Sequence, residues 1–219
     1  MKPIDTSLLH RVILPEHSSA AVHPTLIMLH GRGADEEDLP GLLPHMDERL
    51  LVLSPRAPYP FGYGGYTWYD VGEVGEPEPA MFSSSYEKLG AFVRDALRHY
   101  PIDRERLFLF GFSMGTVMSY ALGLSMPETF RGVLANSGYV PEGTNVPLRW
   151  RDLSHTGFFI AHGTGDPVIP VTFGRKARDL FGQSNADWTY HEYPMAHQIS
   201  EESINDAAAW LLGRIAPTT

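Results

Sequence analysis

The chain has 219 residues, of which 43% are hydrophobic and 20% are charged, the composition of an ordinary globular protein. Asp and Glu number 26 against 17 Lys and Arg, and the resulting net charge of −9 argues against nucleic acid or an anionic membrane as a partner. The chain contains no cysteine, which excludes disulfides, thiolate metal sites and a cysteine nucleophile.

One domain spanning residues 1–219 is the natural expectation for this length. The start of the chain lacks the apolar core of a secretory signal, and no stretch reaches the length of a membrane span. We therefore expect a cytoplasmic protein without stable membrane association. The composition leaves open whether the chain forms a homodimer.

Short apolar segments alternate with segments of helical periodicity, a pattern that is typical of α/β proteins. Several apolar segments are hydrophobic throughout, as expected for strands that helices cover on both faces. The sequence therefore predicts an α/β fold with a mostly parallel central sheet flanked by helices. The predicted strands are residues 11–14, 25–29, 50–53, 107–110, 132–135, 158–161 and 189–193.

A glycine-rich turn follows the second predicted strand, where residues 30–33 read H-G-R-G. Such a turn can point a backbone N–H group at a developing oxyanion, and the N–H of Arg32 is the candidate. A plain turn is the alternative. The turn is not a phosphate loop, because the pattern G-x-x-x-x-G-K-[ST] does not occur in the chain.

Residues 55–83 do not fit the alternation, because they combine many Gly and Pro residues with several aromatic ones. A loop this long in a compact domain is usually functional or disordered, and its aromatic residues argue against disorder. We expect this segment to form a wall of the active site. Aromatic rings that only cover the edge of the sheet are an equally good explanation.

Two helical patterns are clear. The first begins near Ser84, where residues 84–87 have capping-box spacing, and it ends at Pro101. The second covers residues 204–215. Their apolar stripes indicate packing against the sheet and no further role.

Residues 111–115 read G-F-S-M-G and follow directly after a predicted strand. The pattern G-x-S-x-G at a strand-to-helix turn exposes the serine hydroxyl and points N–H groups of the helix N-terminus at the same place. The glycines permit a strained turn with close neighbouring backbone. We predict that Ser113 is a nucleophile and that the N–H of Met114 stabilises the oxyanion. A chance match is the alternative, which the helix-forming residues after the motif disfavour.

A serine nucleophile needs a histidine base, which in this architecture follows the serine and the acid in the chain. His197 lies after the last predicted strand and ahead of the last helix, where a loop at the carboxyl edge of the sheet would reach the serine. His162 ends a strand itself, so a backbone or packing role fits it better, and His191 lies within a strand. His197 is therefore the predicted base.

The base needs a carboxylate that orients it, and Asp166 is the best candidate. It lies just past a predicted strand, in a turn of Gly and Pro residues that could hold one carboxylate rigidly. An Asp that merely caps this turn is the alternative. Glu192 lies within a strand and faces away from His197, and Asp103 and Asp152 lie in connections without a matching strand end.

The sequence shows no ligand cluster, so we expect neither a cofactor nor a metal. Residues 191–197 carry a histidine at each end, but the spacing is wrong for zinc and Pro194 breaks the helix that such a site requires.

With these residues identified, the chain resembles the phospholipase/carboxylesterase family of small α/β-hydrolases, which includes acyl-protein thioesterases. The resemblance implies an α/β-hydrolase fold, a triad of Ser113, Asp166 and His197, and oxyanion N–H groups from Arg32 and Met114. It runs from about Thr25 to Ile215 and rests on five blocks in the family's order, residues 29–33, 68–70, 111–115, 163–170 and 195–197.

Two of these blocks also suggest contacts with substrate. Residues 68–70 match a family block near the substrate groove, so the resemblance implies substrate-binding roles for Trp68, Tyr69 and Asp70. Met195, in the block of the base, is expected to contribute as well.

The chain also departs from the family pattern. Acyl-protein thioesterases usually have Gln where Met114 stands and Gly where Thr116 stands. Their first turn usually reads H-G-x-G-D, whereas here Ala34 precedes Asp35. An oxyanion hole made of backbone tolerates these changes, but they make a generic carboxylesterase a better hypothesis than an enzyme for lipidated proteins.

The leading hypothesis is therefore a serine carboxylesterase that hydrolyses small-molecule esters of short to medium acyl length through an acyl-enzyme. An acyl thioesterase or lysophospholipase with the same triad is the alternative. A binding protein on a retired hydrolase fold is a weaker one, because the serine, acid and histidine are all intact.

Access to the site depends on the connections around it. Residues 136–157, where lipases often insert a helical cap, are interrupted by Gly and Pro, so we expect no cap domain and an open groove. Glu73, Glu76 and Glu78 are expected to disfavour anionic substrates.

Overall fold

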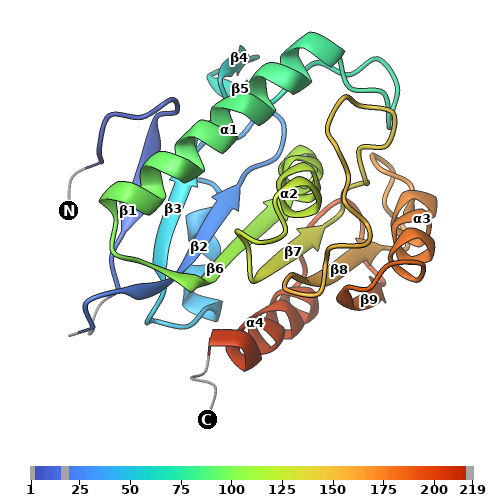
Figure 1. Ribbon diagram of the computed structural model, residues 1–219. Helices are drawn as coiled ribbons and strands as arrows, with labels where there is room; N and C mark the ends of the chain where they lie inside the picture. The colour runs from blue at the N-terminus through green and yellow to red at the C-terminus, as the bar shows by residue number, and fades with distance from the viewer. Residues whose placement is uncertain (1–2, 16–19, 216–219) are drawn as a thin grey trace.

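A computed structural model describes residues 3–15 and 20–215; residues 1–2, 16–19 and 216–219 of the expected domain lie outside the described residues. A seven-stranded sheet runs through the structure in the order β1-β3-β2-β6-β7-β8-β9 (Figure 1). Only β1 is antiparallel to its neighbour, and all other adjacent strands are parallel. The strands are β1 (His10–Ile13), β2 (His23–Leu29), β3 (Leu51–Pro55), β6 (Ile102–Phe112), β7 (Gly132–Asn136), β8 (Gly157–Gly163) and β9 (Asp187–Tyr193).

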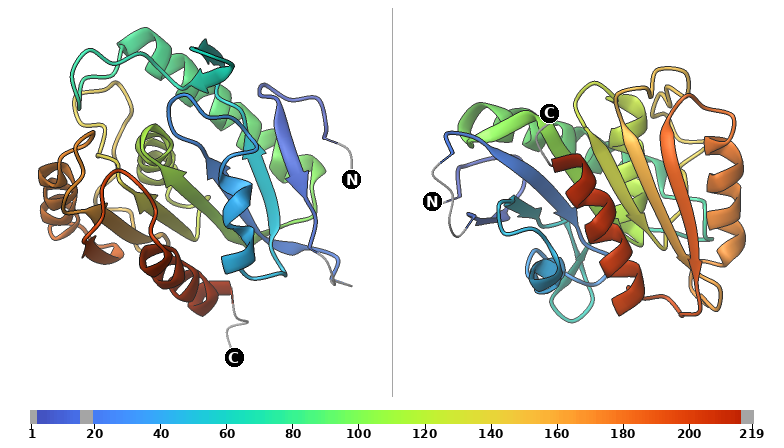
Figure 2. Two further views of the ribbon diagram at one scale, coloured as in Figure 1. Left: turned by 180° about the vertical axis from the view of Figure 1, so that it is seen from behind. Right: turned by 90° about the horizontal axis from the view of Figure 1, so that it is seen from below.

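Helices cover both faces of this sheet, which confirms the predicted fold class. The larger core cluster includes residues of α1 (Pro79–His99), α2 (Met114–Ser125) and α3 (Val171–Phe181). The smaller cluster, on the other face, includes residues of α4 (Glu201–Ile215) and of the 3-10 helix η1 (Leu39–His45). Seen from behind, α4 and η1 lie in front of the sheet (Figure 2).

The two covered faces explain why the strands are hydrophobic throughout. Along β6, Leu107 and Leu109 belong to the larger cluster, whereas Phe108 and Phe110 belong to the smaller one. Successive side chains of a strand point to opposite faces, so a strand covered on both sides has no solvent-facing position.

Helix α1 begins at Pro79, so the predicted start near Ser84 is wrong. The carboxylate of Glu78 caps the helix by accepting the N–H groups of Ala80 at 3.1 Å and Met81 at 2.6 Å. A proline at the first helical position is favourable because its missing N–H would have no partner there.

Residues 55–83 do not form the single long loop that the sequence predicts. They contain a small hairpin of β4 (Tyr59–Phe61) and β5 (Gly65–Thr67), followed by the first turn of α1. Helix α3 was also missed. Its buried residues are Gly174, Ala177 and Phe181, two of which are small.

The connection between β7 and β8 bears on access to the site. Residues 137–156, which join β7 and β8, contain neither helix nor strand, in agreement with the expectation of no cap domain. In the described part of the chain, no helix is long and apolar enough to cross a membrane.

Candidate active site

The turn between β6 and α2 places Ser113 at the carboxyl edge of the sheet. Ser113 has a φ of 55° and a ψ of −120°, a conformation that residues with a Cβ rarely adopt. Its N–H donates to the carbonyl of Asn136 at 3.0 Å, and its own carbonyl accepts the N–H groups of Thr116 at 2.9 Å and Val117 at 3.2 Å. The strained conformation is thus fixed by hydrogen bonds on both sides of the residue.

Steric contact explains both glycines of the G-x-S-x-G motif. A Cβ at Gly111 would lie 2.5 Å from the backbone of Thr116, and a Cβ at Gly115 would overlap the carbonyl oxygen of Leu29. The second contact shows that α2 begins directly against the end of β2. The turn after β2 therefore lies beside the elbow, and a Cβ at Gly31 would be 3.4 Å from the Cβ of Ser113.

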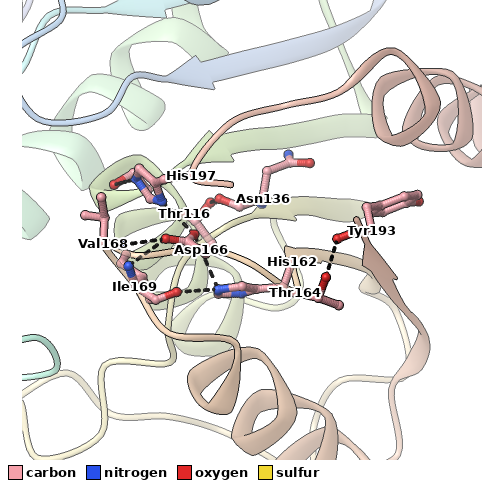
Figure 3. A network of polar contacts seen from close by, with 10 residues as sticks. Thr116, Asn136, His162, Thr164, Asp166, Val168, Ile169, Tyr193 and His197 are labelled. Atoms are coloured by element: carbon pink, nitrogen blue, oxygen red, sulfur yellow. Dashed lines mark hydrogen bonds and ion pairs between the residues drawn. The ribbon is translucent and has the colours of Figure 1, made fainter. Parts of the chain in front are cut away.

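Three side chains that the sequence analysis selected are in hydrogen-bond contact. His197 Nε2 lies 2.9 Å from Ser113 Oγ, and His197 Nδ1 lies 2.7 Å from Asp166 Oδ2. The other carboxylate oxygen of Asp166 accepts the N–H groups of Val168 and Ile169, each at 2.8 Å (Figure 3). The Asp166 side chain is fully buried, whereas that of His197 is 15% exposed. The acid is therefore held from the protein side and the imidazole is open toward solvent.

The loops that carry the acid and the base are joined to each other. Thr164 N–H donates to the carbonyl of Tyr193 at 2.8 Å, and Gly165 N–H donates to that of Met195 at 3.1 Å. A Cβ at Gly163 would overlap the same Met195 carbonyl. These contacts fix the spacing of two loops that are about thirty residues apart in the chain.

His162 lies beneath this acid and does not contact the serine. Its Nε2 is 2.8 Å from the carbonyl of Ile169 and 3.7 Å from Asp166 Oδ2, and its side chain is 1% exposed (Figure 3). Burial lowers the pKa of His162, which favours the neutral ring. The backbone and packing role expected for this histidine agrees with its surroundings.

Two N–H groups beside the serine are free to bind an oxyanion. In the residues that the structure describes, the N–H of Arg32 has no acceptor, and that of Met114 opens helix α2 without one. Both belong to segments that pack directly against Ser113. The arrangement can therefore hold a negative oxygen between the turn after β2 and the start of α2.

The turn that contains Arg32 is supported by His30, a residue to which sequence patterns assign no role. The carbonyl of His30 accepts the Trp68 indole N–H at 2.9 Å. The imidazole bridges the carbonyl of Gly31 at 2.7 Å and the N–H of Ala57 at 3.0 Å, which requires a neutral ring with the proton on Nδ1. Burial lowers the pKa of His30, in accord with that state.

Three of the four residues expected to bind substrate are core residues. The side chains of Trp68 and Tyr69 are fully buried, and Tyr69 Oη lies 3.1 Å from Tyr139 Oη. Met195 is 7% exposed and belongs to the smaller core cluster. Ser113 is itself only 7% exposed, so burial does not decide whether a residue contacts a ligand, and the substrate-binding roles of Trp68, Tyr69 and Met195 stay predictions.

The fourth, Asp70, lines an open hollow of about 650 Å³ beside the turn, together with Arg32. The other lining residues are Val71, Gly72, Glu76, Pro77, Glu78 and Pro79. Residues of the segment 70–79 therefore line a hollow next to Arg32, but none of the aromatic rings of residues 55–83 does, and a wall of the active site stays a prediction.

No group of three or more His, Asp or Glu side chains among the described residues is arranged to hold a metal ion. His162, Asp166 and His197 at this edge are instead paired with each other or with backbone. This set can abstract a proton from a serine hydroxyl and stabilise an oxyanion.

Comparisons with known proteins agree with this chemistry. A family model described as Phospholipase/Carboxylesterase matches residues 11–213. Acyl-protein thioesterase 1 of Mycosarcoma maydis is 30% identical over 233 residues, covering 94% of this chain and 97% of that protein. Acyl-protein thioesterase 1 of Debaryomyces hansenii is 31% identical over 156 residues, or 66% of each chain. The crystal structure of a Bacillus cereus carboxylesterase has the same fold, with a TM-score of 0.83 and 24% identity over 94% of both chains.

Proposed function

Since this chain belongs to the phospholipase/carboxylesterase family, we propose that it is a serine carboxylesterase that hydrolyses small-molecule carboxylic esters of short to medium acyl length. The observation that supports this best is the hydrogen-bonded series from Ser113 through His197 to Asp166, with distances of 2.9 Å and 2.7 Å. Nucleophilic catalysis by serine needs a base within hydrogen-bond reach of the hydroxyl and a carboxylate that orients the base, so these distances support the proposal.

In the proposed reaction, His197 Nε2 takes the proton of Ser113 as the serine Oγ attacks the ester carbonyl. The N–H groups of Arg32 and Met114 stabilise the tetrahedral oxyanion. His197 then gives the proton to the leaving alcohol, and water repeats the sequence on the acyl-enzyme. Asp166 stays ionised throughout and stabilises the imidazolium that forms.

The groove supports the proposed substrate range. The hollow beside Arg32 is open. Residues 137–156, which connect β7 to β8 along the chain, form neither a helix nor a strand that could cover it. A short acyl chain makes enough contact in an open groove, whereas a long acyl chain would leave most of its apolar surface exposed to solvent there. A neutral ester also avoids the acidic residues of the groove wall.

An acyl thioesterase is the second candidate, because the curated relatives above are named acyl-protein thioesterases. The same triad and oxyanion hole serve both reactions, so geometry does not separate them. We also propose that the chain is a single domain, because both core clusters pack on one sheet, and that it is cytoplasmic, because a cysteine-free sequence suits that compartment.

A panel of substrates tests the proposal. The p-nitrophenyl esters of acetate, butyrate, octanoate and palmitate are compared with acyl-coenzyme A thioesters of the same chain lengths. We expect the highest kcat/KM for the acetate to octanoate esters. Higher kcat/KM for the thioesters would favour the second candidate, and no turnover together with no labelling of Ser113 by a fluorophosphonate would leave a binding protein.

A further inference from the structure

The hollow beside the candidate oxyanion turn has an uneven charge. Among the described residues that line it, Arg32 is the only basic one, against the acidic Asp70, Glu76 and Glu78. Arg32 directly follows Gly31, where an added Cβ would lie 3.4 Å from the Cβ of Ser113, so the hollow adjoins the turn that packs against the candidate nucleophile.

The guanidinium of Arg32 is held at the edge of this hollow by two partners. Its centre lies 4.2 Å from the centroid of the Phe61 ring, and its Nη2 lies 3.7 Å from Asp70 Oδ1. The side chains of Arg32 and Asp70 are 36% and 62% exposed, so both charges act on whatever enters the hollow. Stacking on Phe61 fixes the position of the cation, and only Asp70 offsets its charge by direct pairing.

The other acidic residues are less able to offset Arg32. The carboxylate of Glu78 is occupied in capping α1, where it accepts the N–H groups of Ala80 and Met81. Within the described residues, Asp70 is the only acidic side chain in an ion pair with Arg32. One carboxylate thus decides whether the hollow presents a free cation.

We propose that Asp70 is a specificity-determining residue of the ester-binding groove, which neutralises Arg32 so that neutral esters are accepted and esters with a carboxylate are rejected. The inference rests on the proposed esterase function. Without Asp70, the guanidinium keeps its place on Phe61 and becomes available to a substrate carboxylate. Loss of Asp70 removes a carboxylate that repels an anionic ester and leaves the Arg32 guanidinium free to attract it, so both effects favour the anionic ester.

The test compares two esters that differ at one end of the acyl chain: p-nitrophenyl pentanoate and the mono-p-nitrophenyl ester of glutaric acid. The measured quantity is the ratio of kcat/KM for the anionic ester to that for the neutral one. In Asp70→Asn we expect this ratio to rise about fivefold at low salt, the size expected for one charge a few ångströms away in a solvated groove. The rise should shrink as ionic strength increases, because the pair is exposed.

Two further variants separate the pair from a general change in net charge. Glu128→Gln alters net charge by the same amount at an exposed ion pair with Arg149, beyond the far end of α2, and it should change the ratio less than about twofold. In the double variant Arg32→Gln and Asp70→Asn, the ratio of kcat/KM for the anionic ester to that for the neutral ester should return to the parent value. The carboxylate of Asp70 has no partner besides Arg32 among the described side chains, so Asp70→Asn should fold, which a melting curve checks.

The outcomes that overturn the inference differ from those that overturn the function. If the parent chain hydrolyses neither ester, the esterase proposal fails and the inference fails with it. If both esters are hydrolysed and the ratio is unchanged in Asp70→Asn, only the inference fails. A rise that persists in the double variant, or at high salt, would also overturn the role given to the Arg32–Asp70 pair.

Discussion

Thr116 and Asn136 hydrogen-bond to each other in both directions across the gap between α2 and β7. The Thr116 hydroxyl donates to the Asn136 carbonyl at 2.7 Å and accepts the Asn136 N–H at 3.0 Å (Figure 3). The same carbonyl accepts the N–H of Ser113, and the Asn136 side-chain amide donates to the carbonyl of Gly111 at 3.1 Å. The strained elbow is therefore fastened to the neighbouring strand through one hydroxyl and one asparagine.

The first prediction follows from this contact. Thr116→Val keeps the shape of the side chain but leaves the buried N–H of Asn136 without a partner. We expect a loss of about 1–3 kcal/mol in the free energy of unfolding, measured with urea, together with a lower kcat. Thr116→Ser restores the hydroxyl and should recover most of both. Equal stability and kcat in the Val and Ser variants would show that the hydroxyl does not hold the elbow.

Ser113→Ala should abolish ester turnover and labelling by fluorophosphonates, because the described active site offers no other nucleophile next to His197. Ser137→Ala is the matched control. Ser137 is buried and also has a positive φ, of 50°, but its hydroxyl has no hydrogen-bond partner within the described residues. The control should keep its activity. Turnover or labelling in folded Ser113→Ala would remove Ser113 from the mechanism.

Asp166→Asn should fold and yet lose kcat by about 10⁴-fold. One carboxylate oxygen accepts two backbone N–H groups and the other faces His197 Nδ1, so the amide of Asn must turn its NH₂ toward the imidazole. Nδ1 then becomes an acceptor and Nε2 carries the proton, which leaves no base for the serine. Steady-state kinetics on the purified variant measures the loss. A variant with reduced stability but full activity per folded molecule would make Asp166 a turn residue only.

The contact of Ser113, His197 and Asp166 could be predicted because it depends on short motifs with strict geometry. Gly111 and Gly115 are present because any Cβ there meets backbone, and Asp166 and His197 lie in loops that meet at one edge of the sheet. These constraints are visible in sequence. The predicted strands were correct for a similar reason, since a strand with two covered faces has to be hydrophobic at every position.

The errors have physical reasons as well. The family resemblance suggests that Trp68 and Tyr69 lie near the substrate groove, but sequence does not show that both side chains are fully buried. The start of α1 was missed because an ordinary glutamate, Glu78, serves as the cap in place of the serines of the capping box. The support from His30 depends on contacts with residues far along the chain, such as Trp68, and no local pattern reports them.

Stability should fall as the pH drops below about 6.5, the ordinary pKa of histidine. Burial lowers the pKa of His10, His30 and His162, so the unfolded chain binds protons in a range where the native state does not. The free energy of unfolding therefore rises with pH through the window between the lowered pKa values and 6.5, by up to about 1.4 kcal/mol per pH unit for each histidine. His162→Gln should reduce this slope, measured by urea unfolding at several pH values. An unchanged slope in His162→Gln would show that His162 does not contribute.

The last prediction concerns access to Ser113. Lipases that carry a lid gain activity sharply when their ester forms micelles or droplets, because the interface opens the lid. Here the connection between β7 and β8 contacts α3 at two places. The ring centroids of Tyr139 and Phe173 are 5.7 Å apart, and Lys176 Nζ lies 2.6 Å from Glu142 Oε2. Because this connection has no helix and its residues Tyr139 and Glu142 contact α3, the rate with p-nitrophenyl butyrate should saturate smoothly below the solubility limit of the ester. A sharp increase at that limit would reveal a covering segment, and it would favour a lipase over the esterase proposed above.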